Sequence, residues 1–135
     1  MTRAGLVSLF DQFGILPTSQ RMEIAAILLE RPQHMSAEHI IDKLKGSGSK
    51  VSKATVYNSL NLFSKHGLVR EVMVDPVRKF YDSTTHPHHH FYNVDSGELS
   101  DIPDEQVCFQ DLPELPKGTE RESIEVLIKV RDSSQ

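Results

Sequence analysis

Apolar residues recur at helical spacing in the first half of the chain. Leu6, Leu9, Phe10 and Phe13 lie three or four positions apart, which predicts a helix over residues 3–13 that stops at Gly14. Similar spacing behind a Ser or Thr N-cap predicts three more helices. They cover residues 20–30, the stretch after Ser36 up to the glycine- and serine-rich run 46–49, and residues 52–66.

After Gly67 the apolar pattern changes to that of β-strands. Strands are predicted over residues 68–74, 79–83, 88–94, 98–102, 106–110 and 124–130, with a turn at Asp75-Pro76. Three helices followed by a hairpin form a winged helix-turn-helix, here with one additional helix in front. The predicted fold class is therefore α+β, with a winged-helix domain over residues 1–83 and a small, mostly β domain over residues 84–135.

The fourth predicted helix is the one that a helix-turn-helix inserts into the major groove of DNA. Its apolar stripe leaves a polar face that carries Lys53, Thr55, Tyr57 and Asn58. Lys53 suits a phosphate, Tyr57 a base edge or a thymine methyl group, and Asn58 the N6 and N7 atoms of adenine. The alternative is that these residues only solvate an exposed helix face.

Charge is distributed unevenly along the 135 residues. Residues 1–82 carry eleven Lys or Arg and eight Asp or Glu, whereas residues 83–135 carry four and eleven. A mildly basic first half fits a polyanionic partner, and an acidic second half fits a cation. Arg70, Arg78 and Lys79 on the predicted hairpin would then contact the DNA backbone.

Composition excludes several classes of protein. The single cysteine, Cys108, forms no disulfide within the chain and excludes a zinc site built from paired CxxC motifs. No apolar stretch approaches the roughly 20 residues of a membrane-spanning helix, and residues 1–5 lack the pattern of a secretory leader. A cytoplasmic protein with no membrane partner is expected.

Four of the seven histidines lie in the run His86-Pro87-His88-His89-His90. Imidazole is the commonest protein ligand of transition metals. On a strand His88 and His90 share one face and His89 lies on the other. The run therefore predicts a metal site or a haem site, against the alternative of a solvated loop.

The second half is too small to bury much apolar surface alone, since it holds about 50 residues and short strands. Pairing with a second copy is the economical remedy. A twofold homodimer would also present two reading helices to a palindromic operator in double-stranded DNA.

Five motifs in order carry a resemblance to a known family. They are Thr18-Ser19-Gln20-Arg21, residues 34–40 (HMSAEHI), residues 54–60 (ATVYNSL), Lys65-His66-Gly67-Leu68-Val69, and the stretch His-x-His-Phe-Tyr-x-x-x-x-Gly from His88. Together they resemble the ferric uptake regulator family of metal-responsive transcription factors. The histidine run and residues 115–120 (LPKGTE) resemble its iron response regulator branch, whose members are associated with haem.

The resemblance implies one regulatory metal site per subunit. The family's ligand positions correspond to His34, Asp82, His88, His90 and Asp101. Three imidazoles and two carboxylates suit Mn²⁺, Fe²⁺ or Zn²⁺. One ion held by both domains would fix their relative pose and so control DNA binding.

The chain departs from the family pattern at several positions. Asn93 and Ser96 stand where many members have a cysteine pair, so the structural zinc that four cysteines hold in those members is expected to be absent. Asn58 stands where Arg is common, and Pro87 where a second site would need His. His89 is expected to face outward, where it could ligate haem together with His88 or His90.

The leading interpretation is a metal-responsive or haem-responsive DNA-binding transcriptional regulator of metal homeostasis, and not an enzyme. A peroxide-sensing regulator of the same family is one alternative, and a metal-binding or haem-binding module that no longer binds DNA is another. A metalloenzyme is disfavoured because five ligands leave no open coordination position.

Overall fold

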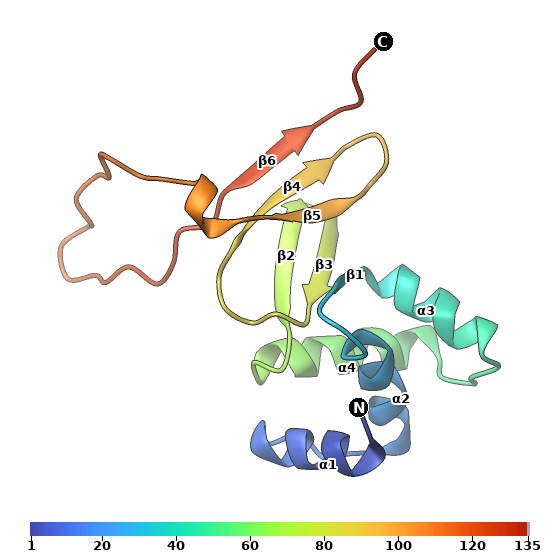
Figure 1. The fold of residues 1–135 in the computed structure, drawn as a ribbon. Helices are drawn as coiled ribbons and strands as arrows, with labels where there is room; N and C mark the ends of the chain where they lie inside the picture. Colours follow the sequence, from blue (N-terminus) through green and yellow to red (C-terminus); the bar gives the residue numbers. More distant parts are fainter. Residues whose placement is uncertain (135) are drawn as a thin grey trace. The chain divides into compact units, whose positions relative to one another are not determined.

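The computed structural model describes residues 1–134 as an α+β protein, which confirms the predicted fold class. The chain forms two compact units, one comprising Met1–Thr85 and the other beginning at His86. The first unit contains four α-helices and a small sheet, and the other contains a second small sheet; Figure 1 shows these elements. Within residues 1–134, no helix is long and apolar enough to cross a membrane.

The four helices begin where the sequence places a hydroxyl side chain. They are α1 (Arg3–Gln12), α2 (Ser19–Leu28), α3 (Ala37–Gly46) and α4 (Lys53–Lys65). The N-cap hydroxyls of Thr2, Thr18, Ser36 and Ser52 each accept a hydrogen bond from the backbone N–H three residues further on. Each bond satisfies one of the N–H groups that a helix start leaves without an intrahelical partner.

The helical core is built from the apolar stripes that the sequence predicts. Phe10 of α1 and Phe63 of α4 are fully buried, and their rings meet edge to face with centroids 5.6 Å apart. The other fully buried apolar residues of the helices are Ile24, Ala25, Leu28, Ile40, Val56 and Leu60. Gly67, at φ +81°, then lets the chain leave α4 in a left-handed conformation that disfavours side chains.

The wing is a three-stranded antiparallel sheet in the order β1-β3-β2. It comprises β1 (His34–Met35), β2 (Arg70–Asp75) and β3 (Arg78–Asp82). The Asp75 carboxylate accepts hydrogen bonds from the N–H groups of Val77 and Arg78, both at 2.9 Å, which forms the predicted turn. The sequence does not predict strand β1, because two residues are too few to show a period.

The second unit is a three-stranded sheet in the order β5-β4-β6. Its strands are β4 (His89–Asn93), β5 (Leu99–Ile102) and β6 (Leu127–Val130). Strand β5 runs antiparallel to β4, whereas β6 runs parallel to it. A parallel neighbour needs a long connection, and Figure 1 shows the chain after β5 as an extended loop that returns to β6.

The predicted strand over residues 106–110 is wrong. Asp104–Gln106 forms a 3₁₀ turn, and residues 107–110 lie in neither helix nor strand. Both edges of the central strand β4 are occupied by β5 and β6. The alternating run around Phe109 therefore has no edge of β4 to pair with, and the Phe109 ring is 44% exposed.

Candidate metal centre and nucleic-acid interface

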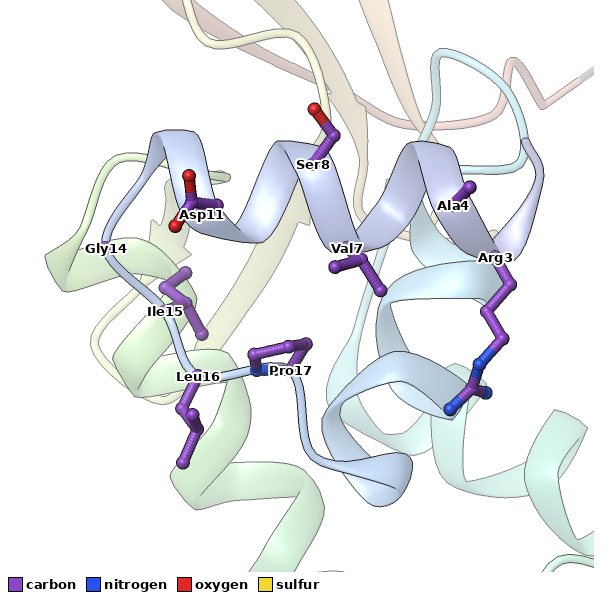
Figure 2. Close-up of a pocket in the computed structure, with 9 residues that line it drawn as sticks. All are labelled: Arg3, Ala4, Val7, Ser8, Asp11, Gly14, Ile15, Leu16 and Pro17. Atoms are coloured by element: carbon purple, nitrogen blue, oxygen red, sulfur yellow. The ribbon is translucent and has the colours of Figure 1, made fainter.

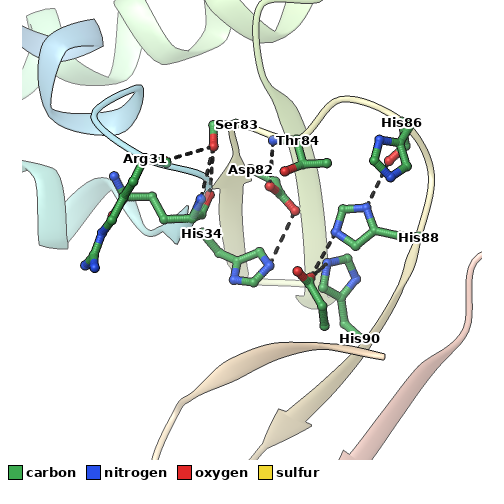
Figure 3. A network of polar contacts seen from close by, with 10 residues as sticks. Arg31, His34, Asp82, Ser83, Thr84, His86, His88 and His90 are labelled. Atoms are coloured by element: carbon green, nitrogen blue, oxygen red, sulfur yellow. Dashed lines mark hydrogen bonds and ion pairs between the residues drawn. The ribbon is translucent and has the colours of Figure 1, made fainter. Parts of the chain in front are cut away.

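The wing brings together two of the five predicted ligands. His34 lies directly opposite Asp82 in the β1–β3 ladder. The His34 Nε2 atom is 3.5 Å from the Asp82 Oδ2 atom, and the Asp82 side chain is almost fully buried (Figure 3). The other oxygen, Oδ1, accepts a hydrogen bond of 2.8 Å from the Thr84 N–H, which orients the carboxylate toward His34.

Backbone pairing next to His34 explains why this segment stays in place. The Ser83 N–H donates to the Gln33 carbonyl at 3.2 Å, and the Gln33 N–H donates to the Ser83 hydroxyl at 3.1 Å. The Gln33 side-chain amide also donates to the Ile27 and Leu28 carbonyls at the end of α2. The chain just before α3 is thus attached both to β3 and to α2.

The second unit brings together the other three predicted ligands. His90 lies opposite Asp101 in the β4–β5 ladder. The Asp101 Oδ1 atom is 3.0 Å from the His88 Nε2 atom and 3.4 Å from the His90 Nε2 atom. Both rings are buried, while Asp101 is exposed. One ligand atom from each residue lies within 4.8 Å of the other two, and Figure 3 shows His88 and His90 on the same side of the chain.

The tautomer of His88 follows from its backbone contact. Its Nδ1 atom is 2.9 Å from the His86 carbonyl oxygen, which can only accept, so Nδ1 carries a proton. In the neutral ring Nε2 then presents a lone pair toward an oxygen of Asp101. Lone pairs that converge in this way suit a cation, and a carbonyl partner on the other ring nitrogen is the usual arrangement for a metal-bound histidine.

Each unit therefore offers part of a donor set made of imidazole nitrogen and carboxylate oxygen. His34 and Asp82 provide one of each, and His88, His90 and Asp101 provide two nitrogens and one oxygen. This donor chemistry fits Mn²⁺, Fe²⁺ or Zn²⁺ and disfavours ions that seek thiolate.

Helix α4 presents the predicted polar face. Lys53, Tyr57 and Asn58 are exposed, whereas the Thr55 side chain is half-buried. The Ser52 hydroxyl accepts from the Thr55 N–H and donates to the Thr55 Oγ1 atom at 2.9 Å, so Thr55 also takes part in the helix cap. The opposite face of the helix packs into the core through Val56, Leu60 and Phe63.

Comparison with known proteins identifies the protein family of this chain. The model of the ferric uptake regulator family matches residues 12–127. The chain belongs to the ferric uptake regulator family. A peroxide-responsive repressor, PerR, of Staphylococcus aureus (strain Mu50) is 32% identical over 91 residues, which are 67% of this chain. The chain spans 62% of the length of that relative.

Solved structures share the fold. The ferric uptake regulator from Francisella tularensis with iron has a TM-score of 0.73 and 24% sequence identity, covering 90% of this chain and 95% of that one. The ferric uptake regulator from Pseudomonas aeruginosa with manganese has a TM-score of 0.70 and 24% identity, covering 99% and 100%. At this identity the likeness establishes the fold alone.

The family resemblance puts a cysteine pair at the turn between β4 and β5, where this chain has Asn93 and Ser96. The Asn93 Oδ1 atom accepts hydrogen bonds from the N–H groups of Asp95 and Ser96, at 2.8 and 3.0 Å. The Ser96 hydroxyl accepts from the Glu98 N–H at 3.2 Å. Hydrogen bonds from these two side chains thus close the turn.

The prediction that His89 faces outward is wrong. Its side chain points away from the Asp101 face and is only 8% exposed. The His89 Nδ1 atom accepts a hydrogen bond of 2.8 Å from the Val126 N–H, and the ring meets Phe109 edge to face at 6.0 Å. This bond occupies one of the two ring nitrogens that haem could use. Haem at His88 or His90 stays a prediction.

Sequence reasoning missed one polar contact of α4. The Tyr57 hydroxyl donates a hydrogen bond of 2.7 Å to the Glu38 Oε1 atom in the first turn of α3. This hydrogen bond is the main reason that the pKa of Glu38 is lowered, and the carboxylate in turn raises the pKa of Tyr57. The sequence indicates Glu38 only as an acid that favours the start of a helix, and Tyr57 lies 19 positions further along the chain, so no local pattern shows the pairing.

Lys79 and Arg78, two of the cations predicted on the wing, lie beside acidic side chains. The Lys79 Nζ atom lies 3.2 Å from Glu71 Oε1, and the Arg78 Nε atom lies 3.8 Å from Asp75 Oδ2. Arg78 and Asp75 are the more exposed pair. Exposed pairs of this kind are worth little, so these cations can exchange their partners for phosphate.

A cavity of about 1020 Å³ lies along α1 and the segment that follows it. Figure 2 shows Val7, Leu16 and Pro17 around it, with Arg3 and Asp11 toward the two ends of the helix. Its lining is mostly apolar and includes none of the predicted site residues.

Proposed function

We propose that the protein is a metal-responsive, sequence-specific DNA-binding transcriptional regulator of metal homeostasis. The observation that carries the proposal is the division of the predicted ligands, with His34 and Asp82 in the unit that contains α4, and His88, His90 and Asp101 in the other. One divalent cation, Mn²⁺, Fe²⁺ or Zn²⁺, bound by all five would join the two units. Membership of the ferric uptake regulator family supports this reading.

The proposed mechanism is a shift between poses of the two units. On this proposal, the linker around Thr85 would leave the units free to adopt several poses when no ligand is shared. A cation that binds best in one pose favours that pose only by its difference in affinity. A coupling of about 1–3 kcal/mol between metal and DNA is the usual scale for such a device.

On the DNA side, we propose that α4 enters the major groove. Lys53 would contact a phosphate, and Tyr57 and Asn58 would contact base edges. Thr55, at the start of the helix, would contact the backbone through the part of its side chain that the cap leaves exposed. Arg70, Arg78 and Lys79 of the wing would contact phosphates beside the groove.

The active species is proposed to be a homodimer on a palindromic operator. The second unit exposes a set of large apolar side chains: Val94, Phe109, Leu112, Leu115, Ile128 and Val130. A second copy of this unit is the economical cover for these side chains, because a twofold interface buries the same residues on both subunits. Two copies of α4 would then meet successive turns of the duplex.

A cytoplasmic, non-enzymatic role completes the proposal. The chain has a single cysteine, which is free and exposed. Five ligands around one ion leave little room for a substrate. The relatives by sequence are named as repressors, which agrees with regulation rather than catalysis.

The decisive experiment measures binding to duplex DNA selected from a random library, with and without Mn²⁺, at a stated salt concentration. The proposal expects metal to tighten binding about fivefold or more, in line with the usual coupling. His88→Ala and His90→Ala should remove the response, while His39→Ala, which deletes an exposed histidine of α3, should keep it. Metal-independent affinity in the wild type would overturn the metal-sensing function.

Peroxide sensing is the second candidate, favoured by the name of the Staphylococcus aureus relative. In this variant of the function, hydrogen peroxide would oxidise an imidazole beside bound Fe²⁺ and end DNA binding. Mass spectrometry of the Fe²⁺-loaded protein after peroxide should then find one added oxygen on His34, His88 or His90. Unmodified histidines together with unchanged DNA affinity would eliminate this candidate.

A further inference from the structure

The base-reading face of α4 contains one side chain whose polar end is held by another helix. The Tyr57 hydroxyl lies 2.7 Å from Glu38 Oε1, while the tyrosine as a whole remains 40% exposed. Glu38 belongs to neither the metal ligands nor the predicted DNA contacts. Its contact with Tyr57 joins the first turn of α3 to the first two turns of α4.

The direction of this hydrogen bond is fixed by the chemistry of the two groups. An ionised carboxylate can only accept, so the phenol must donate its single proton. Because the bond to Tyr57 lowers the pKa of Glu38, and the carboxylate raises the pKa of Tyr57, the proton stays on the phenol at neutral pH. The Tyr57 oxygen therefore keeps only acceptor capacity for any further partner.

Base pairs differ in what they offer such an oxygen in the major groove. Adenine presents an N6 amino group and cytosine an N4 amino group, which donate. Guanine O6 and N7 and thymine O4 only accept. We infer that Glu38 is a specificity-determining positioning residue that makes the Tyr57 hydroxyl an acceptor, so that it selects an adenine or cytosine amino group. This inference rests on the proposed DNA-binding function.

The surroundings of the pair leave room for such a contact. A cavity of about 420 Å³ opens beside Glu38 and Tyr57 and is lined on its other sides by Ser36, Lys79 and Tyr81. Lys53 contributes to the low pKa of Glu38 as a nearby positive charge, after the hydrogen bond to Tyr57. That cation offsets the repulsion between the carboxylate and a phosphate backbone.

The first test compares the sequences that variants select from a random duplex library in the presence of Mn²⁺. The wild type should prefer an amino-bearing base at one position of each half-site. Glu38→Gln keeps the shape but carries an amide that can both donate and accept, so this preference should fall about fivefold or more, the value of one hydrogen bond. Asp42→Asn is the matched control, because it removes a charge from the exposed face of α3 one turn further on.

The two variants distinguish an effect of charge from an effect of the direction of the Tyr57–Glu38 hydrogen bond. Both reduce repulsion of DNA and should strengthen binding to all duplexes alike, but only Glu38→Gln should change the preferred base. Equal preference in the wild type and in Glu38→Gln would overturn the inference. A preference that changes equally in Asp42→Asn would also overturn it, because charge alone would then be the cause.

The second test removes the proposed partner atom from the DNA. Replacing the selected adenine by purine, or the selected cytosine by 2-pyrimidinone, deletes one amino group. The wild type should bind the DNA that lacks the amino group about fivefold more weakly than the unmodified DNA. Tyr57→Phe should bind the two DNAs equally well. An equal loss in both proteins overturns the role of the hydroxyl. A wild type that selects no sequence at all overturns the proposed function itself, which distinguishes the two failures.

Discussion

His34 faces Asp82 across the β1–β3 ladder, with 3.5 Å between the Nε2 and Oδ2 atoms. The carboxylate is buried, and its other oxygen is occupied by the Thr84 N–H. A buried acid next to an imidazole is costly unless a proton or a cation compensates it. The pair thus already has the composition of a metal half-site within the wing.

Asp82→Asn should weaken the binding of Mn²⁺ by at least about tenfold, the lower end of the loss found for residues that only orient metal ligands. The amide keeps an oxygen for the Thr84 N–H, so the wing should fold normally. Isothermal titration of the full chain measures the change. Asp11→Asn, at an exposed position of α1, serves as the control, and an undiminished affinity in Asp82→Asn would exclude Asp82 as a ligand.

His89→Ala should destabilise the second unit by about 1–3 kcal/mol, because it leaves the Val126 N–H without its acceptor and removes a buried ring. The hydrogen bond joins β4 to the residue just before β6. Hydrogen exchange of the Val126 amide should become faster, while amides of α4 keep their protection. Protection of Val126 equal to that of the wild type would show that backbone pairing alone holds β6.

Tyr57→Phe should raise the pKa of Glu38 toward its ordinary value of 4.5, since the hydrogen bond from Tyr57 is the largest cause of the lowered value. In the folded wild type the depressed pKa contributes stability above pH 4.5, and this contribution is lost as the pH falls through the folded value. NMR titration of the Glu38 carboxyl carbon reads the pKa directly. An identical titration in both proteins would contradict the hydrogen bond.

Ile128→Glu should weaken self-association by about tenfold or more, because a charge placed in an apolar interface must be desolvated. Ile128 lies on β6 and is 41% exposed. Sedimentation equilibrium of the full chain measures the dissociation constant. The control is Val77→Glu on the wing turn, where Val77 is 88% exposed, and it should leave the dissociation constant unchanged. An intact dimer in Ile128→Glu would show that Ile128 does not lie in the interface.

The features that were predictable from the sequence are local ones. All four helices are indicated by apolar residues at a period of about 3.6, and three of them also by an N-cap hydroxyl such as Ser36 or Ser52. Both signals lie within about a dozen residues. The turn at Asp75 has an equally local cause in the hydrogen bonds of one carboxylate. The alternation of His88, His89 and His90 likewise follows from strand geometry alone.

The features that were not predictable depend on residues far apart in the chain. Whether residues 106–110 can pair with β4 depends on whether an edge of β4 is open. One of these edges is occupied by β6, which begins only at Leu127. The burial of His89 was likewise hidden, because the Val126 N–H that bonds to its ring comes from the distant chain just before β6. The Glu38–Tyr57 bond needs the crossing of α3 and α4, which no local pattern specifies. The five-residue ligand set came from family resemblance rather than from periodicity.

Only five residues of chain, 83–87, lie between Asp82 of the first unit and His88 of the second. If the proposed five-residue site forms, a tether this short would give each group of ligands an effective concentration of about millimolar or above with respect to the other. A cation captured by one group would then meet the second as an intramolecular event. The concentration of free metal that triggers a response would accordingly depend on the length and stiffness of residues 83–87 as well as on the donor atoms themselves.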